Sequence, residues 1–468
     1  MRARTTFIVS LASALLLAAT LHAAEAAPVN IDDTQVFQEI DGFGAAMTAS
    51  SAWLLKNVLN DLQRQTAMEE LFDSEKGIGI SYVRISMGAC DFRLKEYTYD
   101  DVPAGQDDLK LEKFSIAPDE EYIIPMLRLA LQINPKLKIM ASPWSAPAWM
   151  KDGGTLAGGK LKSDDSTYEA YANYFVHFIK SYAADGIPID AVTLQNEPHH
   201  TNSGYPTMRM EPPDQARLAR LLGERLKAEK LETRIIVWDH NWDEPSYATA
   251  VLADPAARPY IDGSAFHAYA GKVEAQSKVH DAFPDKNIYF TESSGGDWAK
   301  DFGGNVMWDT SNLIIGSTRN WARTVLKWNL ALDEKNGPKI PGGASNCRGV
   351  ITINQKTKAV TKNEEYYAFG QASKFVRAGA HRVYSTSTSS VAFVNPDKSL
   401  VLIVMNKGDD QKAFSVGWKQ QSFTYNLPPV SVATFTWPDQ KSAPVEVTIT
   451  SGDKSKLLAQ QPGTHFTH

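Results

Sequence analysis

The strongest constraint on the fold is an alternation that runs from residue 40 to about residue 335. Short apolar or β-branched runs recur there, and a longer stretch with helical periodicity follows each of them. Eight such runs are strand candidates, at 42–47, 81–87, 138–143, 191–196, 234–239, 263–268, 287–291 and 326–330. Eight strands that alternate with helices are typical of a parallel (β/α)8 barrel, the TIM barrel. We therefore expect an α/β protein built on one such barrel.

One connecting helix is well marked. Ser166 and Glu169 form the Ser-x-x-Glu pattern of a capping box, so we expect the helix to begin at Ser166. Apolar residues recur on one face over 168–182. Gly186 and Pro188 end the pattern. The next apolar run, 191–194, is then a barrel strand that leads into Asn196 and Glu197.

The pattern changes after about residue 375. The runs 391–395, 400–406, 421–427 and 430–437 are rich in Val, Phe, Tyr and Thr and are separated by turn residues. Such runs predict the antiparallel strands of a small β-sandwich. Residues 29–37 are expected to add a strand, and 445–450 are another candidate. The expected domains are a catalytic barrel at 38–375, a β-sandwich from 27–37 plus 376–440, and a C-terminal extension at 441–468.

The first residues predict an export signal at 1–26. Arg2 and Arg4 give a positive start, 7–21 form an apolar run, and Ala24-Glu25-Ala26 offers small residues for cleavage near Ala26. The run is too short for a membrane helix, and no later stretch has the ~20 apolar residues that a span needs. We expect a secreted or periplasmic protein without stable membrane insertion.

Composition excludes several classes of protein. The 468 residues are 43% hydrophobic and 22% charged, which is typical of a globular chain. The net charge of −6 gives no basic excess that would predict nucleic-acid binding. Two cysteines, Cys90 and Cys347, and scattered histidines form no zinc-spaced cluster, so we expect neither a metal nor another cofactor. One disulfide would be compatible with export. Because Cys90 falls in the wall of the expected site, however, we expect two free thiols. The sequence leaves the oligomeric state open.

Active sites of TIM barrels lie at the C-terminal ends of the strands. At these ends stand Arg84, Asp91, Trp144, Asn196, Glu197, His267, Tyr269, Glu292 and Trp328. Carboxylates, amides and indoles together are suited to a sugar, because rings stack on its C–H faces while polar groups bind its hydroxyls. Glu197 and Glu292 stand out, because glycoside hydrolysis needs one acid and one nucleophile or base. The stretch 239–243 is either a substrate-binding loop or the capped start of a helix.

Several motifs in order resemble one family. They are Asp41-Gly42-Phe43-Gly44, Cys90-Asp91-Phe92, Ala141-Ser142-Pro143-Trp144, Asn196-Glu197-Pro198, Phe290-Thr291-Glu292 and Trp328-Asn329-Leu330-Ala331-Leu332. Together they resemble glycoside hydrolase family 30, the family of lysosomal glucosylceramidase and of microbial β-1,6-glucanases. The resemblance runs from about residue 30 to about residue 437. It implies a TIM barrel with a side β-sandwich, which agrees with the pattern of strands.

The resemblance also implies a role for each site residue. Glu197 resembles the general acid/base and Glu292 the nucleophile, while Asn196 resembles the amide that holds the sugar 2-hydroxyl. Asp91, Trp144 and Trp328 resemble residues that grip the other hydroxyls of a terminal glucose. Tyr269 resembles the phenol that bonds the nucleophile, with His267 and Arg84 in support. An acid catalyst must begin protonated, so we expect a raised pKa for Glu197 and an ionised Glu292.

The expected function is that of a secreted retaining β-glycosidase acting on β-glucosyl linkages. Its substrate partner is either a β-glucan or a glucosyl lipid, that is, β-1,6-glucan or glucosylceramide. The stretches 239–243 and 267–271 resemble the microbial glucanase branch more closely. Another substrate of the family, such as xylan or a fucoside, is the first alternative. The second is a catalytically weak sugar-binding homologue, against which the presence of both carboxylates argues.

Overall fold

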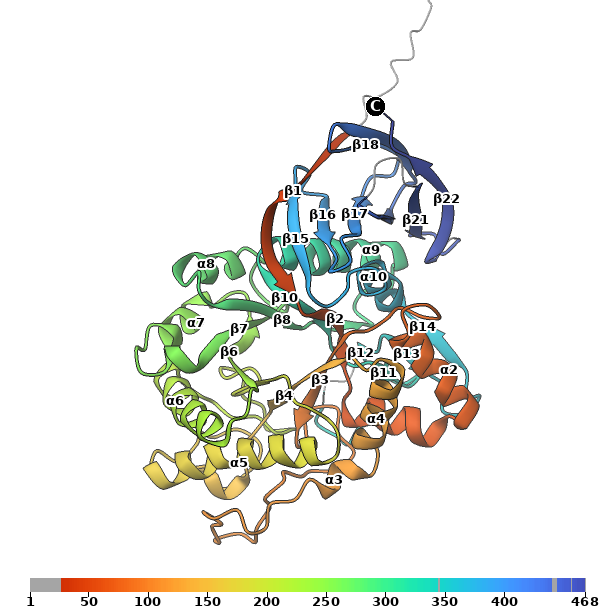
Figure 1. Ribbon diagram of the computed structural model, residues 1–468. Helices are drawn as coiled ribbons and strands as arrows, with labels where there is room; N and C mark the ends of the chain where they lie inside the picture. Colours follow the sequence, from red (N-terminus) through yellow and green to blue (C-terminus); the bar gives the residue numbers. More distant parts are fainter. Residues whose placement is uncertain (1–26, 344–345, 440–443, 456, 468) are drawn as a thin grey trace, which may run out of the picture.

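The protein consists of a barrel with a curled sheet on its flank (Figure 1). The computed structural model describes residues 27–343, 346–439, 444–455 and 457–467. The expected export signal at 1–26 lies outside the described residues. No helix in the described ranges is long and apolar enough to cross a bilayer.

Eight parallel strands close the barrel in the order β10-β2-β3-β4-β5-β6-β7-β8, which confirms the predicted fold class. Their bounds are β2 (Gly42–Ala46), β3 (Tyr82–Met87), β4 (Lys138–Pro143), β5 (Ala191–Thr193), β6 (Arg234–Asn241), β7 (Ile261–His267), β8 (Asn287–Glu292) and β10 (Ala322–Lys327). The largest correction concerns β10, which begins four residues before the expected 326 (326 − 322 = 4). The charged Arg323 interrupts the apolar run at the start of β10, so the pattern does not show that the strand begins there. Arg323 is tolerated at this position because it pairs with Asp41 at the base of the barrel.

Helices surround the barrel. They are α1 (Ala49–Trp53), α2 (Asp61–Phe72), α3 (Ala117–Glu120), α4 (Ile123–Ile133), α5 (Asp165–Ala184), α6 (Pro212–Glu229), α7 (Pro245–Leu252), α8 (Ala275–Ala282), α9 (Phe302–Trp308) and α10 (Glu364–Ser373), with helical turns η1 (Leu54–Val58), η2 (Ala148–Met150), η3 (Arg258–Tyr260) and η4 (Asp309–Ser317). The predicted start of α5 at Ser166 is wrong. Asp164 caps this helix instead, accepting a 2.9 Å hydrogen bond from the N–H of Thr167. Aspartate is as good a cap as serine, and it stands two residues earlier in the chain.

The flanking sheet has nine strands in the order β19-β18-β1-β15-β16-β17-β20-β21-β22. They are β1 (Ala27–Ile40), β15 (Ala380–Ser385), β16 (Ser390–Val394), β17 (Leu400–Asn406), β18 (Lys412–Trp418), β19 (Gln421–Leu427), β20 (Ser431–Trp437), β21 (Pro444–Ser451) and β22 (Ala459–His465). In Figure 1 the red β1 lies beside the blue β15, with which it pairs antiparallel. The sheet curls until Ser422 in β19 bridges Thr467 beyond β22, which gives a sandwich around an apolar core.

Sequence reasoning found β1, β16, β17, β19, β20 and β21, but not β15, β18 or β22. The segment after residue 441, expected to be an extension, adds two strands to the sheet. Short strands also tie loops together at the rim of the barrel, namely β9 (Gly295–Gly296), β11 (Ala331–Leu332), β12 (Cys347–Arg348), β13 (Ile351–Ile353) and β14 (Val360–Lys362).

A network of ion pairs closes the base of the barrel. Asp41 is fully buried and contacts Lys138 at 2.6 Å, Arg234 at 2.9 Å and Arg323 at 3.0 Å. A buried cluster of side chains from the barrel strands, among them Tyr82, Met140 and Tyr289, fills the interior of the barrel above Asp41. The opposite end, where the strands terminate, is therefore where polar side chains can face a ligand.

Candidate active site

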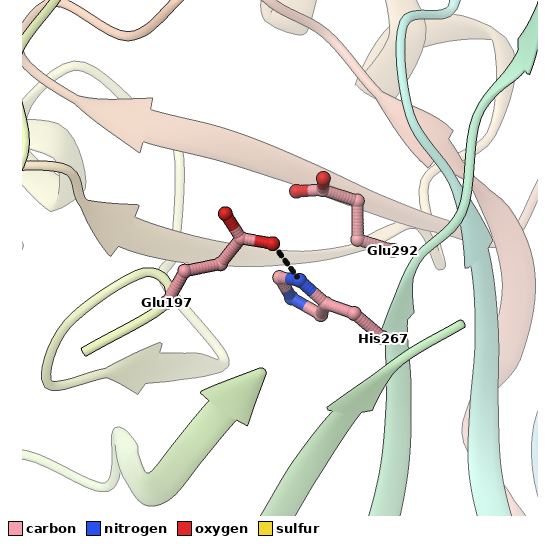
Figure 2. Close-up of side chains that lie close together, drawn as sticks. All are labelled: Glu197, His267 and Glu292. Carbon is pink, nitrogen blue, oxygen red and sulfur yellow. Dashed lines mark hydrogen bonds and ion pairs between the residues drawn. The ribbon is translucent and has the colours of Figure 1, made fainter. Parts of the chain in front are cut away.

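Two carboxyl groups face each other at the C-terminal end of the barrel. Glu292 is the last residue of β8, and Glu197 follows β5. One oxygen of each, together with a ring nitrogen of His267, lie within 4.8 Å of one another (Figure 2). Glu197 has a φ of 47°, and its N–H donates to the carbonyl oxygen of Asp239 at 3.0 Å. This left-handed turn directs the Glu197 side chain to the centre, where it meets Glu292.

Glu292 receives two side-chain donors, one from β3 and one from the loop after β7. The hydroxyl of Tyr269 donates to Oε1 at 2.8 Å, and the guanidinium of Arg84 donates to Oε2. Arg84 is fully buried and also reaches Oδ1 of Asn196 at 2.7 Å and Oδ2 of Asp239 at 2.8 Å. Because the amide is planar, the contact of Asn196 with Arg84 turns its NH2 group the other way. Arg84 thus fixes the position of both the nucleophile candidate and the amide beside the other glutamate.

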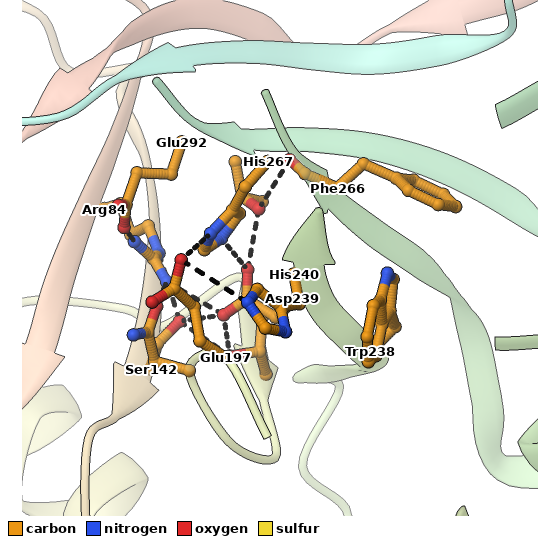
Figure 3. A network of polar contacts seen from close by, with 12 residues as sticks. Arg84, Ser142, Glu197, Trp238, Asp239, His240, Phe266, His267 and Glu292 are labelled. Carbon is orange, nitrogen blue, oxygen red and sulfur yellow. Dashed lines mark hydrogen bonds and ion pairs between the residues drawn. The ribbon is translucent and has the colours of Figure 1, made fainter. Parts of the chain in front are cut away.

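His267 links Glu197 to a buried aspartate (Figure 3). Its Nδ1 lies 3.0 Å from Oε1 of Glu197, and its Nε2 lies 3.0 Å from Oδ1 of Asp239. Asp239 also accepts hydrogen bonds from the hydroxyls of Thr193 and Thr291, each at 2.6 Å. The aspartate is therefore held rigidly beneath the imidazole and orients it.

These contacts decide where the protons lie. Burial would lower the pKa of His267, but Glu292, Asp239 and Glu197 outweigh it and raise that pKa to about 9. Burial would raise the pKa of Glu197, but the hydrogen bond and charge of His267 lower it to about 2. The pKa of Glu292 is raised by burial and by Glu197, against His267 and Arg84.

These pKa directions favour a proton on His267 and an ionised Glu197. The expectation of a raised pKa for Glu197 itself is not met, because the imidazole one hydrogen bond away is the stronger base here. Nδ1 of His267 still lies 3.0 Å from Oε1 of Glu197, so a proton on this nitrogen is one hydrogen bond away from that carboxylate.

A buried cluster of aromatic rings, with one acid, adjoins the pair. Trp144 and Trp328 stack with ring centroids 5.1 Å apart, and Arg84 lies over both rings. Asp91 is buried, and its Oδ1 has no hydrogen-bond partner among the described residues. Burial and the charges of Glu292 and Glu197 raise the pKa of Asp91 to about 7. A buried acceptor without a partner is costly, so this oxygen is placed to receive a ligand donor.

All nine residues singled out in the sequence thus gather at one end of the barrel. Sequence reasoning missed two others. Asp239, in a stretch expected to be either a substrate-binding loop or the capped start of a helix, lies instead in β6 and is the buried support of His267. Tyr205 lies in the loop after Glu197, binds Nε2 of His200 at 2.7 Å and packs on the Trp144–Trp328 cluster. Nothing in its local sequence distinguishes Tyr205 from other loop tyrosines.

Both cysteines are free and buried. Cys90 and Cys347 pack in the same cluster as Trp144 and Trp328. Burial raises the pKa of Cys347 to about 12 and that of Cys90 still further, so both thiols stay protonated and unreactive.

Glu197, His267 and Glu292 have the spacing of metal ligands. Both nitrogens of His267 are already engaged by carboxylates, however, and Arg84 occupies one oxygen of Glu292. The donor set is thus suited to holding protons rather than a cation.

Comparisons with known proteins identify both domains of this chain. The chain matches the glycosyl hydrolase family 30 TIM-barrel domain over residues 40–376 and the family's β-sandwich domain over residues 379–435. It is 32% identical to endo-1,6-β-D-glucanase BGN16.3 of Trichoderma harzianum, over 88% of this chain and 86% of the fungal one. It is 30% identical to the lysosomal acid glucosylceramidase of Mus musculus, over 86% of this chain and 81% of the mouse one.

A solved structure agrees. The endo-β1,6-glucanase BT3312 superposes with a TM-score of 0.83 at 33% identity, covering 88% of this chain and 94% of that one. The names of these relatives are those of O-glycosyl hydrolases, and each aligns with more than four fifths of this chain. With both family domains matched in order over most of its length, the chain belongs to glycoside hydrolase family 30 and is a glycosidase.

Proposed function

We propose that the protein is a retaining β-glucosidase that uses Glu292 as nucleophile and Glu197 as general acid/base. The separation of the two carboxylates carries the proposal, since an oxygen of Glu197 lies within 4.8 Å of one of Glu292. Retaining enzymes hold their carboxyl groups ~5–5.5 Å apart, whereas inverting ones leave ~6.5–9.5 Å for a water molecule.

The first step forms a glycosyl ester. A carboxylate oxygen of Glu292 attacks the anomeric carbon, the bond from that carbon to the leaving oxygen breaks, and Glu197 protonates the leaving oxygen. In the second step water attacks the same carbon, gives a proton to Glu197 and releases Glu292. Two inversions at one carbon give net retention.

His267 supplies the proton that Glu197 lacks at rest. The pair has two forms with the same net charge. In one form Glu197 is ionised and His267 is cationic, and in the other the proton is on Glu197 and both groups are neutral. A sugar that displaces water from the site favours the neutral pair, because separated charges lose their solvation. Substrate binding thus moves the proton across the 3.0 Å hydrogen bond to the group that must donate it.

The glucose-binding pocket is assigned to Asp91, Trp144, Asn196 and Trp328. Asp91 offers an acceptor without a partner, the NH2 group of Asn196 faces away from Arg84, and the stacked indoles form an aromatic wall. Arg84, His267 and Tyr269 hold the two glutamates rather than the sugar.

We infer that the natural substrate is a β-1,6-glucan met outside the cell. The likeness to fungal endo-1,6-β-glucanases and to BT3312 supports this choice, and the amino-terminal export pattern supports secretion. Glucosylceramide is the second candidate, because the lysosomal acid glucosylceramidase of Mus musculus matches 86% of this chain at 30% identity.

Nuclear magnetic resonance of the first-formed sugar tests the proposal. Purified protein is given β-1,6-glucan or glucosylceramide, and the anomeric signal is followed before mutarotation. The proposal expects the β-anomer, from the glucan in preference to the lipid. The α-anomer would mean inversion, and absence of turnover on both would mean a sugar-binding protein without catalysis. Glu292→Gln protein is the control for contaminating glycosidase.

A further inference from the structure

A lysine near the aromatic cluster is buried among neutral oxygens. Lys151 follows η2 and is 1% exposed. Its Nζ donates to Oγ of Ser145 at 2.8 Å, and to the carbonyl oxygens of Leu156 at 2.7 Å and Thr207 at 2.8 Å. The three protons of the ammonium group are therefore all used, and none of these three acceptors is a carboxylate.

Such a buried amine is unfavourable for the fold. Burial lowers the pKa of Lys151 to about 7, against the charge of Asp152, because neutral oxygens replace only part of the hydration of an ammonium ion. An unbranched apolar side chain such as methionine would fill the same space without this penalty. Three directed donors distinguish the lysine from such a residue, so its role lies in the groups that it joins.

The three acceptors come from two loops at the C-terminal end of the barrel. Ser145 and Leu156 belong to the loop between β4 and α5, whereas Thr207 belongs to the loop between β5 and α6. The carbonyl oxygen of Leu156 also accepts a 3.1 Å hydrogen bond from the N–H of Thr207. The backbone of Lys151 is itself fixed by a bridge to Leu161, so the amine reaches this junction from a rigid base.

Two buried cations hold the backbone on either side of Tyr205. Nη2 of Arg93 donates to the carbonyl oxygen of Gly204 at 2.7 Å. Nζ of Lys151 donates to the carbonyl oxygen of Thr207 in the same way. Both side chains are almost completely buried. The segment that carries Tyr205 is therefore fixed from the interior of the protein at two points.

The loop between β4 and α5 carries a second ring. Ser145, which accepts a hydrogen bond from Lys151, directly follows Trp144 in the chain. Trp144 and Tyr205 pack in one cluster with Trp328. One amine thus holds a residue beside the first ring and a residue close to the second.

We propose that Lys151 is a positioning residue for the glycosidase reaction, because its ammonium group joins the two loops and sets the spacing between Trp144 and Tyr205. The inference rests on the proposed function, in which the aromatic cluster forms a wall of the sugar site, and it goes beyond that function by giving a role to a residue outside the site. A wall contacts the sugar before and during the reaction, so its displacement weakens binding of the substrate and of the transition state alike. Loss of the amine should therefore raise KM and leave kcat almost unchanged.

Lys151→Met tests this, since methionine keeps an unbranched side chain and lacks the three donors. At pH 6, where the wild-type amine is protonated, KM on 4-nitrophenyl β-glucoside is expected to rise about tenfold, with kcat within about threefold of wild type. Lys151→Gln keeps two N–H donors and should recover part of the loss. A fall in kcat at unchanged KM would overturn the inference, and so would unchanged kinetics.

Lys160→Met is the matched control. Lys160 lies on the same loop, but half of its side chain is exposed and its Nζ lies 3.6 Å from a carboxylate oxygen of Glu211. An exposed pair of this kind contributes little, so KM should stay at the wild-type value. A rise in KM equal to that of Lys151→Met would show that any change in this loop has the same effect, and would overturn the inference.

A double-mutant cycle tests the link to the ring. Tyr205→Ala should raise KM about as much as Lys151→Met does. Adding Lys151→Met to Tyr205→Ala should then raise KM by less than about threefold, because both changes disturb the same wall. Effects that multiply in full would mean that the two residues act independently, which contradicts the proposed role.

Hydrogen exchange of the backbone amides reports the positioning without any substrate. Lys151→Met should speed exchange in the segments 152–158 and 202–208 and leave the barrel strands as protected as in wild type. Faster exchange throughout the barrel, with a lower melting temperature, would mean a general structural role and overturn the inference. Absence of wild-type turnover would instead contradict the proposed function, and the exchange measurement would still decide whether Lys151 joins the loops.

Discussion

Nδ1 of His267 lies 3.0 Å from Glu197, and Nε2 of the same ring lies 3.0 Å from Asp239. The imidazole is completely buried between two carboxylates. We therefore expect the charge of this imidazole to affect both stability and activity.

Stability should depend on the His267 proton. The pKa of His267 rises from 6.5 to about 9 on folding, so its contribution is complete below pH 6.5 and is lost as pH rises toward 9. The loss for this fully buried group is at most on the order of 3 kcal/mol. Urea unfolding of wild type should thus show a falling free energy of unfolding over that window, and His267→Gln should reduce the fall.

His240 provides the control for that measurement. It lies 3.9 Å from Glu197, and burial lowers its pKa to about 4. His240→Gln should therefore keep the wild-type slope between pH 6.5 and 9. A slope unchanged in His267→Gln would show that His267 does not hold the proton.

The nucleophile should be indispensable. Glu292→Gln leaves no carboxylate to form the glycosyl ester, so kcat should fall by at least about a thousandfold on every substrate. Rates on 4-nitrophenyl β-glucoside and on gluco-oligosaccharides measure this. Substantial activity on either one would assign the nucleophile to another residue.

Loss of the acid/base should depend on the leaving group. Glu197→Gln should strongly slow cleavage of oligosaccharides, whose leaving oxygen needs a proton, and should largely spare ester formation from an activated aryl glucoside. Azide should restore turnover of the aryl glucoside by replacing the water that Glu197 activates. Equal loss for both leaving groups, without azide rescue, contradicts the assignment.

Asp91 should contribute to sugar binding at a cost in stability. Asp91→Asn is expected to lower kcat/KM on β-glucosides by roughly ten- to hundredfold, because a charge-assisted hydrogen bond in a dry pocket contributes about 1.5–3 kcal/mol. Wild type should discriminate against β-galactosides, whose inverted 4-hydroxyl leaves a buried polar group without a partner. Equal wild-type rates on both sugars would refute a glucose-specific pocket.

The same variant should be more stable in alkali. The pKa of Asp91 is raised to about 7, so its buried charge destabilises the fold as pH rises through that value. Asp91→Asn removes this cost, and its free energy of unfolding should exceed that of wild type at pH 8 but not at pH 4. Loss of stability at pH 8 would instead indicate a structural role for the carboxylate.

Cys90 and Cys347 should be detected as two free thiols. Ellman titration of denatured, unreduced protein is expected to find two thiols, and the native protein should react slowly because Cys90 and Cys347 are buried. A count of zero in denatured protein would indicate a disulfide.

Local patterns predicted most of the architecture for a physical reason. A barrel strand is buried on both faces, so it needs a continuous apolar run, as in β4 and β8. β22 has no such run, since Ala459–His465 contains two glutamines, a proline and a glycine. It forms because β21 offers unpaired backbone groups, and that depends on the neighbouring strand rather than on its own residues.

The sequence by itself determined the barrel, the residues at its strand ends and the pair Glu197 and Glu292. Only the tertiary structure decided that the pKa of His267 is raised and that of Glu197 lowered, because a pKa depends on burial and on charges that are near in space, not in sequence. It likewise revealed Asp239 as the support of that histidine, and it brought Ser145, Leu156 and Thr207 around the amine of Lys151. Residues from separate loops create such sites only when the barrel closes and brings the ends of its strands together.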